Sequence, residues 1–258
     1  GSGWKVLLED PVVEIEGRYN FGQMVFVSGW DDRSGILRVL DVGNPATPSY
    51  EPNWVTYRIP KASHAWSHLW TTEWNRIREF NTERYIMDMQ GTFFELSPLG
   101  WAGSVWGVRP LGTHLRIIPD WTSFGGFTVF GDNQGGTIFD NSLLSNQASS
   151  GLYFGYEETV TEWGTPEGWG GPWVHDAVRA NKPSDRFLMT AYNHKIAHFR
   201  VEDKNPLSQA TLVNTVSITI QVDFLGYAGH GFGAEWSNYS TIDMKPGSYH
   251  AEIFPTGF

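Results

Sequence analysis

Residues 82–96 read TERYIMDMQGTFFEL, and this stretch decides the fold class. Its first half alternates between two sets of side chains: Tyr85, Met87 and Met89 in one set, and Arg84, Ile86 and Asp88 in the other. A period of two is that of a β-strand whose faces meet different surroundings. Gln90-Gly91 then supplies a turn, and a second apolar run extends over residues 93–96. The stretch therefore predicts two strands joined by a tight turn.

Strand-like runs of this kind recur along the chain between clusters of Gly, Pro, Asn and Asp, and helix signals are nearly absent. The further runs are residues 23–28, 35–41, 115–118, 127–130, 151–157, 186–192, 196–201, 217–224, 239–244 and 249–254. The clearest alternation is 217–224, which predicts a half-buried strand. The last two runs flank Lys245-Pro246-Gly247-Ser248 and predict a C-terminal hairpin.

Strand pairs that recur every ~40 to 50 residues favour the blades of a β-propeller. The sequence thus predicts an all-β fold of β-propeller type, five-bladed or partial, with a β-sandwich as the alternative. We expect one all-β domain over residues 1–258, with 211–258 as a terminal hairpin unit. Gly1-Ser2-Gly3 resembles a cloning scar, and an end directly after an apolar run suggests a piece of a longer chain.

Composition excludes several classes of function. The formal net charge of −10 repels a phosphate backbone, so we expect no nucleic-acid partner. The chain has no cysteine, which removes disulfides and thiolate zinc sites together. No apolar run approaches the ~20 residues of a membrane span, so no membrane partner is expected either. A secreted or cell-surface location is favoured.

The densest polar cluster spans residues 73–84 and continues to Asp88. Three arginines and three glutamates fall within its twelve residues, although the whole chain has 18 Lys and Arg. One interpretation is a pocket edge, with carboxylates for acid–base work and arginines that hold hydroxyls. The alternative is a salt-bridge network that joins a strand to a neighbouring blade. On the first interpretation the catalytic candidates are Glu79, Glu83 and Asp88, and the substrate-binding candidates are Arg76, Arg78 and Arg84.

A second cluster spans residues 109–120. His114 and Arg116 share one face of the predicted strand, and Asp120 follows it, so all three are candidate substrate contacts. The alternative is a buried histidine held by a backbone carbonyl. We expect no metal site and no cofactor, with Ca²⁺ left open.

Long loops rich in tryptophan are unusual for a purely structural domain. Sugar rings stack on Trp, so Trp169 and Trp173 are candidate substrate contacts on a loop at 163–173 that we expect to act as a lid. The alternative is that these tryptophans fill loop cores in place of disulfides.

The chain also resembles a group of bacterial and archaeal proteins. The motifs are residues 72–79, 82–85, 87–88, 91–96, 114–120, 168–173 and 185–190, within a resemblance that spans about residues 70–258. The group looks like β-propellers of the kind found in carbohydrate-active enzymes. The resemblance implies the fold and further sequence beyond Phe258, and it implies no particular reaction.

Three functions stay open. The first is a carbohydrate-active enzyme, a glycoside hydrolase rather than a lyase, built on the clustered carboxylates with Arg and His. The second is a non-catalytic carbohydrate-binding module or lectin. The third is a structural or assembly protein of a surface layer, filament or capsid. The expected partners are a carbohydrate or other small-molecule ligand and, in the third case, further copies of the chain or a missing companion segment.

Overall fold

The computed structural model describes residues 12–18, 24–41, 53–62, 75–80, 84–96, 100–101, 104–105, 108–114, 118–132, 151–202, 214–223 and 236–256. Over these residues the chain is all-β, as the sequence predicts. The one helical element among them is the short 3₁₀ helix η1 (Glu157–Glu162). No helix in these ranges is long and apolar enough to cross a membrane.

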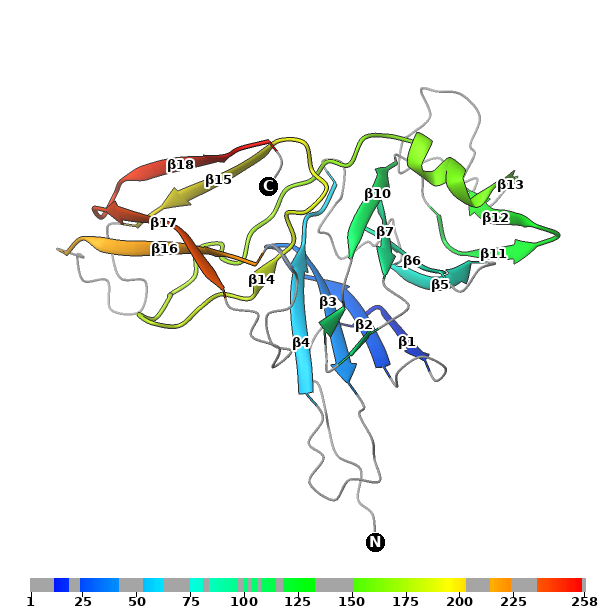
Figure 1. Cartoon of the computed structure of the whole chain (residues 1–258), viewed down its shortest axis with the longest axis horizontal. Coiled ribbons are helices and arrows are strands. Elements are labelled where there is room, and N and C mark those ends of the chain that lie inside the picture. The colour runs from blue at the N-terminus through cyan, green and yellow to red at the C-terminus, as the bar shows by residue number, and fades with distance from the viewer. Residues whose placement is uncertain are drawn as a thin grey trace, which may run out of the picture.

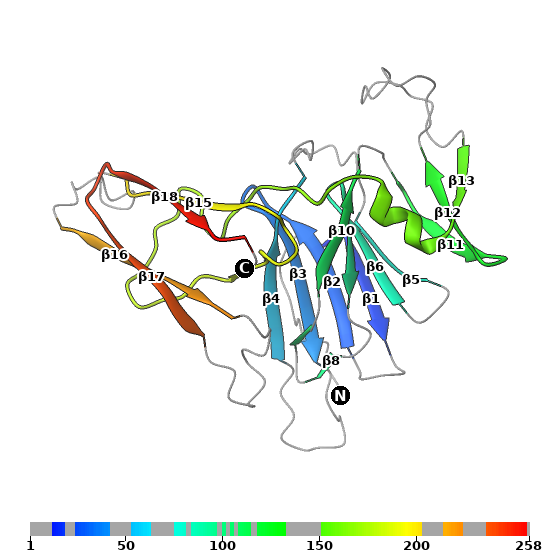
Figure 2. The same ribbon diagram turned by 45° about the horizontal axis from the view of Figure 1, so that its top comes forward.

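Among the described residues up to 155, three sheets of three or more strands follow one another (Figures 1 and 2). The first sheet contains β1 (Glu14–Arg18), β2 (Met24–Trp30), β3 (Gly35–Asp41) and β4 (Asn53–Ile59), antiparallel and in chain order, with β14 (Arg186–Phe187) parallel to β4. The second contains β5 (Arg76–Phe80), β6 (Arg84–Met89), β7 (Thr92–Leu96) and β10 (Arg109–Thr113). The third contains β11 (Trp121–Phe124), β12 (Phe127–Asp132) and β13 (Gly151–Gly155), and β8 (Gly100–Trp101) pairs with β9 (Ser104–Val105).

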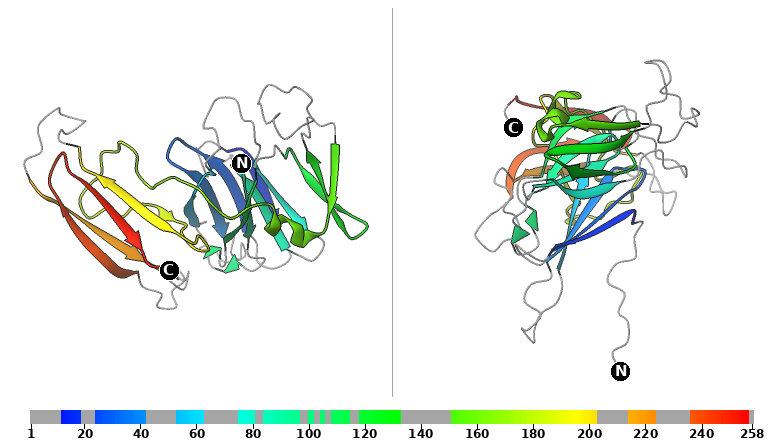
Figure 3. Two further views of the ribbon diagram at one scale, coloured as in Figure 1. Left: turned by 90° about the horizontal axis from the view of Figure 1, so that it is seen from above. Right: turned by 90° about the vertical axis from the view of Figure 1, so that its right-hand side faces the viewer.

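The second sheet is buried on both faces. One hydrophobic core joins it to the first sheet and contains Phe26, Leu37, Tyr85, Met87 and Met89. The other core joins it to the third sheet and contains Ile86, Phe93, Trp121 and Phe130. The alternation predicted for residues 84–89 is therefore confirmed, because each of its two faces packs on a different sheet. The three sheets form successive layers, visible from above in the left panel of Figure 3.

The first strand of each sheet lies at the same side of the stack. β1, β5 and β11 are each an edge strand, and β5 contacts both β1 and β11. The opposite edges of the first two sheets end at β4 with β14 and at β10. We call the side with β1, β5 and β11 the inner edge. The side with β14 and β10 is the outer edge.

Residues 163–188, the outer-edge strap, run along the outer edge from η1 to β14. The amide of Thr113 in β10 donates to the carbonyl of Gly164 (3.2 Å), and Lys61, just after β4, exchanges two 2.8 Å backbone hydrogen bonds with Trp169. The amide of Leu188 donates to the carbonyl of Arg58 (2.9 Å). Backbone hydrogen bonds thus hold this Gly- and Trp-rich segment against the outer edge, in a chain that has no cysteine to form disulfides.

At Gly164 the backbone of the strap lies very close to the second sheet. A Cβ at this position would lie 2.3 Å from the Thr113 carbonyl oxygen, which is backbone and cannot move aside. We expect Gly164→Ala to lower the free energy of unfolding by about 2 kcal/mol, within the usual cost of overpacking. Chemical denaturation measures it. Gly17→Ala is the matched control, because a Cβ there meets nothing within 4 Å; equal losses in the two variants would contradict a tight contact between the strap and β10.

The C-terminal strands form a separate lobe beside the stack (Figures 1 and 3). The strands are β15 (Lys195–Arg200), β16 (Val216–Val222), β17 (Ser237–Met244) and β18 (Tyr249–Phe254). The half-buried alternation predicted at 217–224 is confirmed over residues 217–222 in β16, and residue 224 lies outside the described residues. The predicted hairpin of β17 with β18 is wrong: β17 pairs with β16, and β18 pairs with β15. The turn at 245–248 does form, but Gly247 and Ser248 bond to the backbone of Val201 and carry the chain from one sheet to the other.

The structure also differs from two of the other predicted strand runs. The partner of β12 is Trp121–Phe124 rather than residues 115–118, of which 115–117 lie outside the described residues. Only Arg186 and Phe187 of the predicted run 186–192 are in a strand, because they extend the first sheet beside β4 instead of pairing with β15.

Candidate functional site

Charged side chains gather at the inner edge, where the three first strands meet. The inner-edge cluster consists of Glu14 and Glu16 from β1, Arg76, Arg78 and Glu79 from β5, and Asp120 directly before β11. Arg78 lies 2.5 Å from Glu14 Oε1 and 2.9 Å from Asp120 Oδ2. Arg76 lies 3.3 Å from Glu14 Oε2 and 3.8 Å from Asp120 Oδ2. Two arginines therefore bridge carboxylates from the first and third sheets.

The two-residue period of a β-strand determines toward which side these charged side chains point. Glu14 and Glu16 are two residues apart on β1, opposite Ser28 and Phe26, and Phe26 belongs to the core against the second sheet. The two carboxylates thus point toward the second sheet, while Ile15 faces solvent. Arg76 and Arg78 are likewise two residues apart, so they share one face of β5.

Glu16 is the carboxyl of the cluster whose pKa departs from its ordinary value. Partial burial raises the pKa of Glu16, the nearby charges of Glu14 and Glu79 raise it further, and Arg78 partly offsets this. Burial alone would lower the pKa of Arg78, but Asp120 and Glu14 raise it, which keeps the guanidinium charged. A carboxyl whose pKa is raised beside other carboxylates has the shift in the direction that a general acid needs.

Asp88 and His114 form a second polar group, between the second and third sheets. His114 Nε2 lies 3.0 Å from Asp88 Oδ1, and the two side chains are 1% and 0% exposed. The His114 ring lies 4.7 Å from Phe93 and 6.0 Å from Trp163 between centroids. Burial raises the pKa of Asp88 well above its ordinary value.

This pair is shielded from solvent on every side. The alternative of a buried histidine thus describes His114 correctly, although the side-chain partner of its Nε2 is a carboxyl and not a backbone carbonyl. Side chains with almost no exposed surface cannot touch a substrate in this conformation. The predicted reacting role of Asp88 and the predicted substrate contact of His114 are therefore not supported by their position, and the pair belongs to the core.

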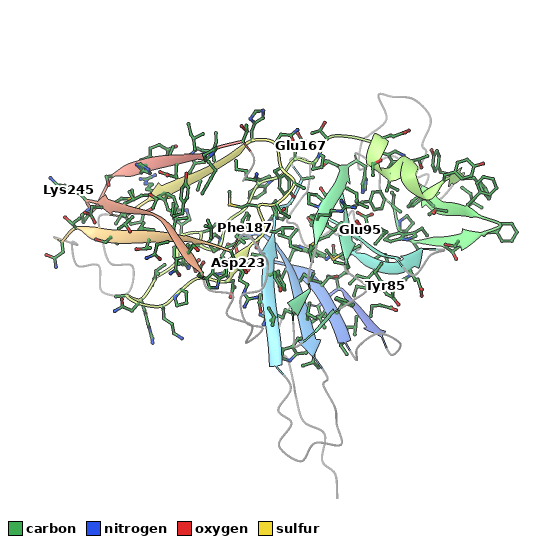
Figure 4. The ribbon with its side chains drawn as sticks, viewed as in Figure 1. Tyr85, Glu95, Glu167, Phe187, Asp223 and Lys245 are labelled. Atoms are coloured by element: carbon green, nitrogen blue, oxygen red, sulfur yellow. The ribbon has the colours of Figure 1, made fainter. Side chains whose placement is uncertain are left out.

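Trp169 lies on the outer edge, away from the inner-edge cluster. Lys61 Nζ is 4.5 Å from the centroid of its ring, and Trp169 is still 47% exposed. Trp173 is 36% exposed on the same strap. In the second sheet the outer and inner edges are three strand spacings apart, roughly 14 Å. The segment 163–173 is therefore fastened beside β4 and β10, and it is not a lid over Arg76 and Arg78. Phe187, at the far end of the strap, is labelled in Figure 4.

The other predicted residues have these positions. Glu79 is exposed on β5, and Asp120 is exposed where the chain enters β11. Glu83 and Arg116 lie outside the described residues, as does the side chain of Arg84. Among the residues that the structure describes, no group of three His, Asp or Glu side chains is placed to hold a metal ion.

Sequence reasoning missed Glu14 and Glu16. The signal that could have found them is the alternation of residues 12–16, Val-Val-Glu-Ile-Glu, in which two carboxylates share one face of a short strand. The sequence pattern does not show which strand packs against that face of β1. That strand is β5, which follows β1 only after β2, β3 and β4.

Comparison with known proteins adds no family to these observations. No family model matches the chain, and neither the curated proteins nor the solved structures contain a significant match.

Proposed function

We propose that this chain is a β-propeller-type protein whose inner edge is a carbohydrate site. Three antiparallel sheets packed face to face in chain order, with their first strands adjacent, support that architecture. A two-layer sandwich has one core between its sheets, whereas the second sheet here has a core on each face. In a propeller the first strands of the blades surround the central ligand site.

The proposed reaction is hydrolysis of a glycosidic bond. The observation that carries it is the inner-edge cluster, in which Glu16 has a raised pKa beside two further glutamates. Glu16 is then the general acid that protonates the leaving oxygen, and exposed Glu79 is the base or nucleophile. Arg76, Arg78 and Asp120 hold sugar hydroxyls through charge-assisted hydrogen bonds.

Glu16→Gln and Glu79→Gln test this function. We expect either change to lower kcat on a responsive glycan by roughly 100-fold or more, because each removes a proton-transfer or nucleophilic group. The melting temperature should stay nearly unchanged, since Glu79 is exposed and Glu16 is only half-buried. Activity is measured on a panel of aryl glycosides and polysaccharides.

The matched control is Glu95→Gln. Glu95 lies on β7 of the same sheet, where it pairs with Arg109 at the surface, and it is labelled in Figure 4. Full activity in Glu16→Gln and Glu79→Gln, or an equal loss in Glu95→Gln, would count against hydrolysis at the inner edge.

A second candidate function is carbohydrate binding without catalysis. Trp169 favours it, because an exposed indole fixed by backbone pairing and by Lys61 offers a rigid face for a sugar ring. In this case glycan binding persists in Glu16→Gln and Glu79→Gln and is lost in Trp169→Ala. A glycan array of the three variants distinguishes the two functions.

A further inference from the structure

The outward side of the third sheet is an extended apolar surface. The register of β11, β12 and β13 places Trp121, Phe130 and Tyr153 on the inward side, in or against the core. The alternate positions point away from the stack. The outer aromatic face consists of Phe124, Phe127, Leu152, Phe154 and Tyr156, each between 37% and 70% exposed. Phe127 and Tyr156 pack together, with ring centroids 5.2 Å apart.

This face has the composition of an interior surface. The other outward positions of the three strands are Thr122, Gly131 and Val129, of which Val129 is only 7% exposed, so none of the described members of this face carries a charge. Five large side chains with this exposure present roughly 500–600 Å², the upper limit of apolar patches on ordinary monomers. The largest apolar patch of a monomer is often a functional surface, and this face has the size of such a patch.

The packing of the sheets indicates what kind of surface fits it. Both faces of the second sheet and the inward face of the third are covered by the apolar face of another sheet. The outer aromatic face repeats the same pattern, and a further three-stranded or four-stranded sheet is its natural complement.

The occupant is identified by area and by symmetry, and the charge of the chain indicates which face two copies can share. The chain carries a net charge of −10, so two copies repel each other wherever charged surfaces meet, and an uncharged face is where this repulsion is smallest. Two copies of the face bury about 1,100 Å² of apolar surface, and a polar rim brings the total to the lower end of stable interfaces, about 1,200 Å². An apolar sheet face can also pack against a copy of itself, as a twofold interface requires.

We propose that the chain forms a twofold dimer through the outer aromatic face, with the third sheets of two copies packed against each other. The order of layers is then first, second and third sheet of one copy, followed by third, second and first sheet of its partner. This interface lies on the far side of the third sheet from the inner-edge cluster, so the dimer does not depend on the proposed hydrolysis.

Sedimentation velocity over a wide range of protein concentrations tests the dimer. We expect a reversible monomer–dimer equilibrium in the unmodified chain. Phe154→Lys should weaken dimerisation by roughly 100-fold or more, because it places a charge from each copy at the centre of an apolar interface. Phe124→Lys, beside the β11–β12 turn, is a second variant whose loss of dimer does not depend on the folding of Phe154→Lys.

Ile253→Lys is the matched control. Ile253 is 71% exposed on β18 in the C-terminal lobe, so this variant adds the same charge on an apolar surface elsewhere. Dimerisation that persists in Ile253→Lys and fails in Phe154→Lys and Phe124→Lys supports the proposal. A monomer at every concentration, or a dimer that only Ile253→Lys dissociates, overturns it.

Discussion

Replacing His114 with alanine is expected to lower the free energy of unfolding by about 4 kcal/mol, within the range for truncating a large buried ring. The substitution removes a ring that is packed against Phe93 and Trp163, and this leaves a cavity between the second and third sheets. It also takes away the partner of Asp88 Oδ1, while Asp88 Oδ2 has no hydrogen-bond partner among the described residues. A fully buried carboxyl with neither oxygen satisfied adds to the cost of the cavity. Urea denaturation followed by tryptophan fluorescence measures the loss.

His198→Ala is the control for this substitution. His198 lies on β15, exposed to solvent, and its ring stacks on Tyr249 at a centroid distance of 5.9 Å. We expect His198→Ala to cost less than about 1 kcal/mol, as is usual for surface positions. Comparable losses in both variants would mean that the His114–Asp88 pair contributes no more than an exposed histidine does.

The individual strands were predictable because their period of two is local information. Residues 84–96 form two strands and a tight turn as expected, and positive φ at Gln90 and Gly91 shows why the turn falls there. The pairing of strands was less predictable. The Pro246-Gly247 turn is of the kind that joins hairpins, yet β17 and β18 belong to different sheets. A turn fixes the direction of the chain, but the hydrogen-bond partner of a strand depends on which distant strand completes its core.

The residues of the candidate site were only partly predictable for the same reason. Arg76 and Arg78 form ion pairs to Glu14 and Asp120, which match the alternative of a salt-bridge network between sheets, and their predicted substrate contacts stay a prediction. The two interpretations are compatible, because a network at the inner edge also presents carboxylates to solvent. Composition alone groups Trp169 with these arginines, and only the sheet order shows that it lies on the opposite edge.

The second large loss of stability is expected when Arg58 is replaced. Its side chain is 5% exposed, and its guanidinium contacts Asp31 (3.0 Å), Asp185 (2.9 Å) and Ser34 Oγ (2.8 Å). Arg58→Ala should lower the free energy of unfolding by about 3 kcal/mol, the lower end for breaking a buried ion pair, because Asp185 still reaches solvent. Arg109→Ala is the matched control: Arg109 is 57% exposed in its pair with Glu95, and its loss should cost at most about 1 kcal/mol.

The pH dependence of the stability loss in Arg58→Ala distinguishes the contribution of the Arg58 charge from the contribution of its packing. Burial alone would raise the pKa of Asp31, but the Ser34 amide, Arg58 and Arg33 together hold it below its ordinary value. A carboxyl with a lowered pKa in the folded state stabilises the fold above the unfolded pKa, about 4, and this contribution disappears as the pH falls through the folded value. Without Arg58 the pKa of Asp31 rises, so the difference in stability between the unmodified chain and Arg58→Ala should be largest near neutral pH and shrink below about pH 4. Denaturation of both chains across that range measures it. A difference that does not vary with pH would assign the effect of Arg58 to the packing of its aliphatic stem rather than to the ion pairs that fasten the strap.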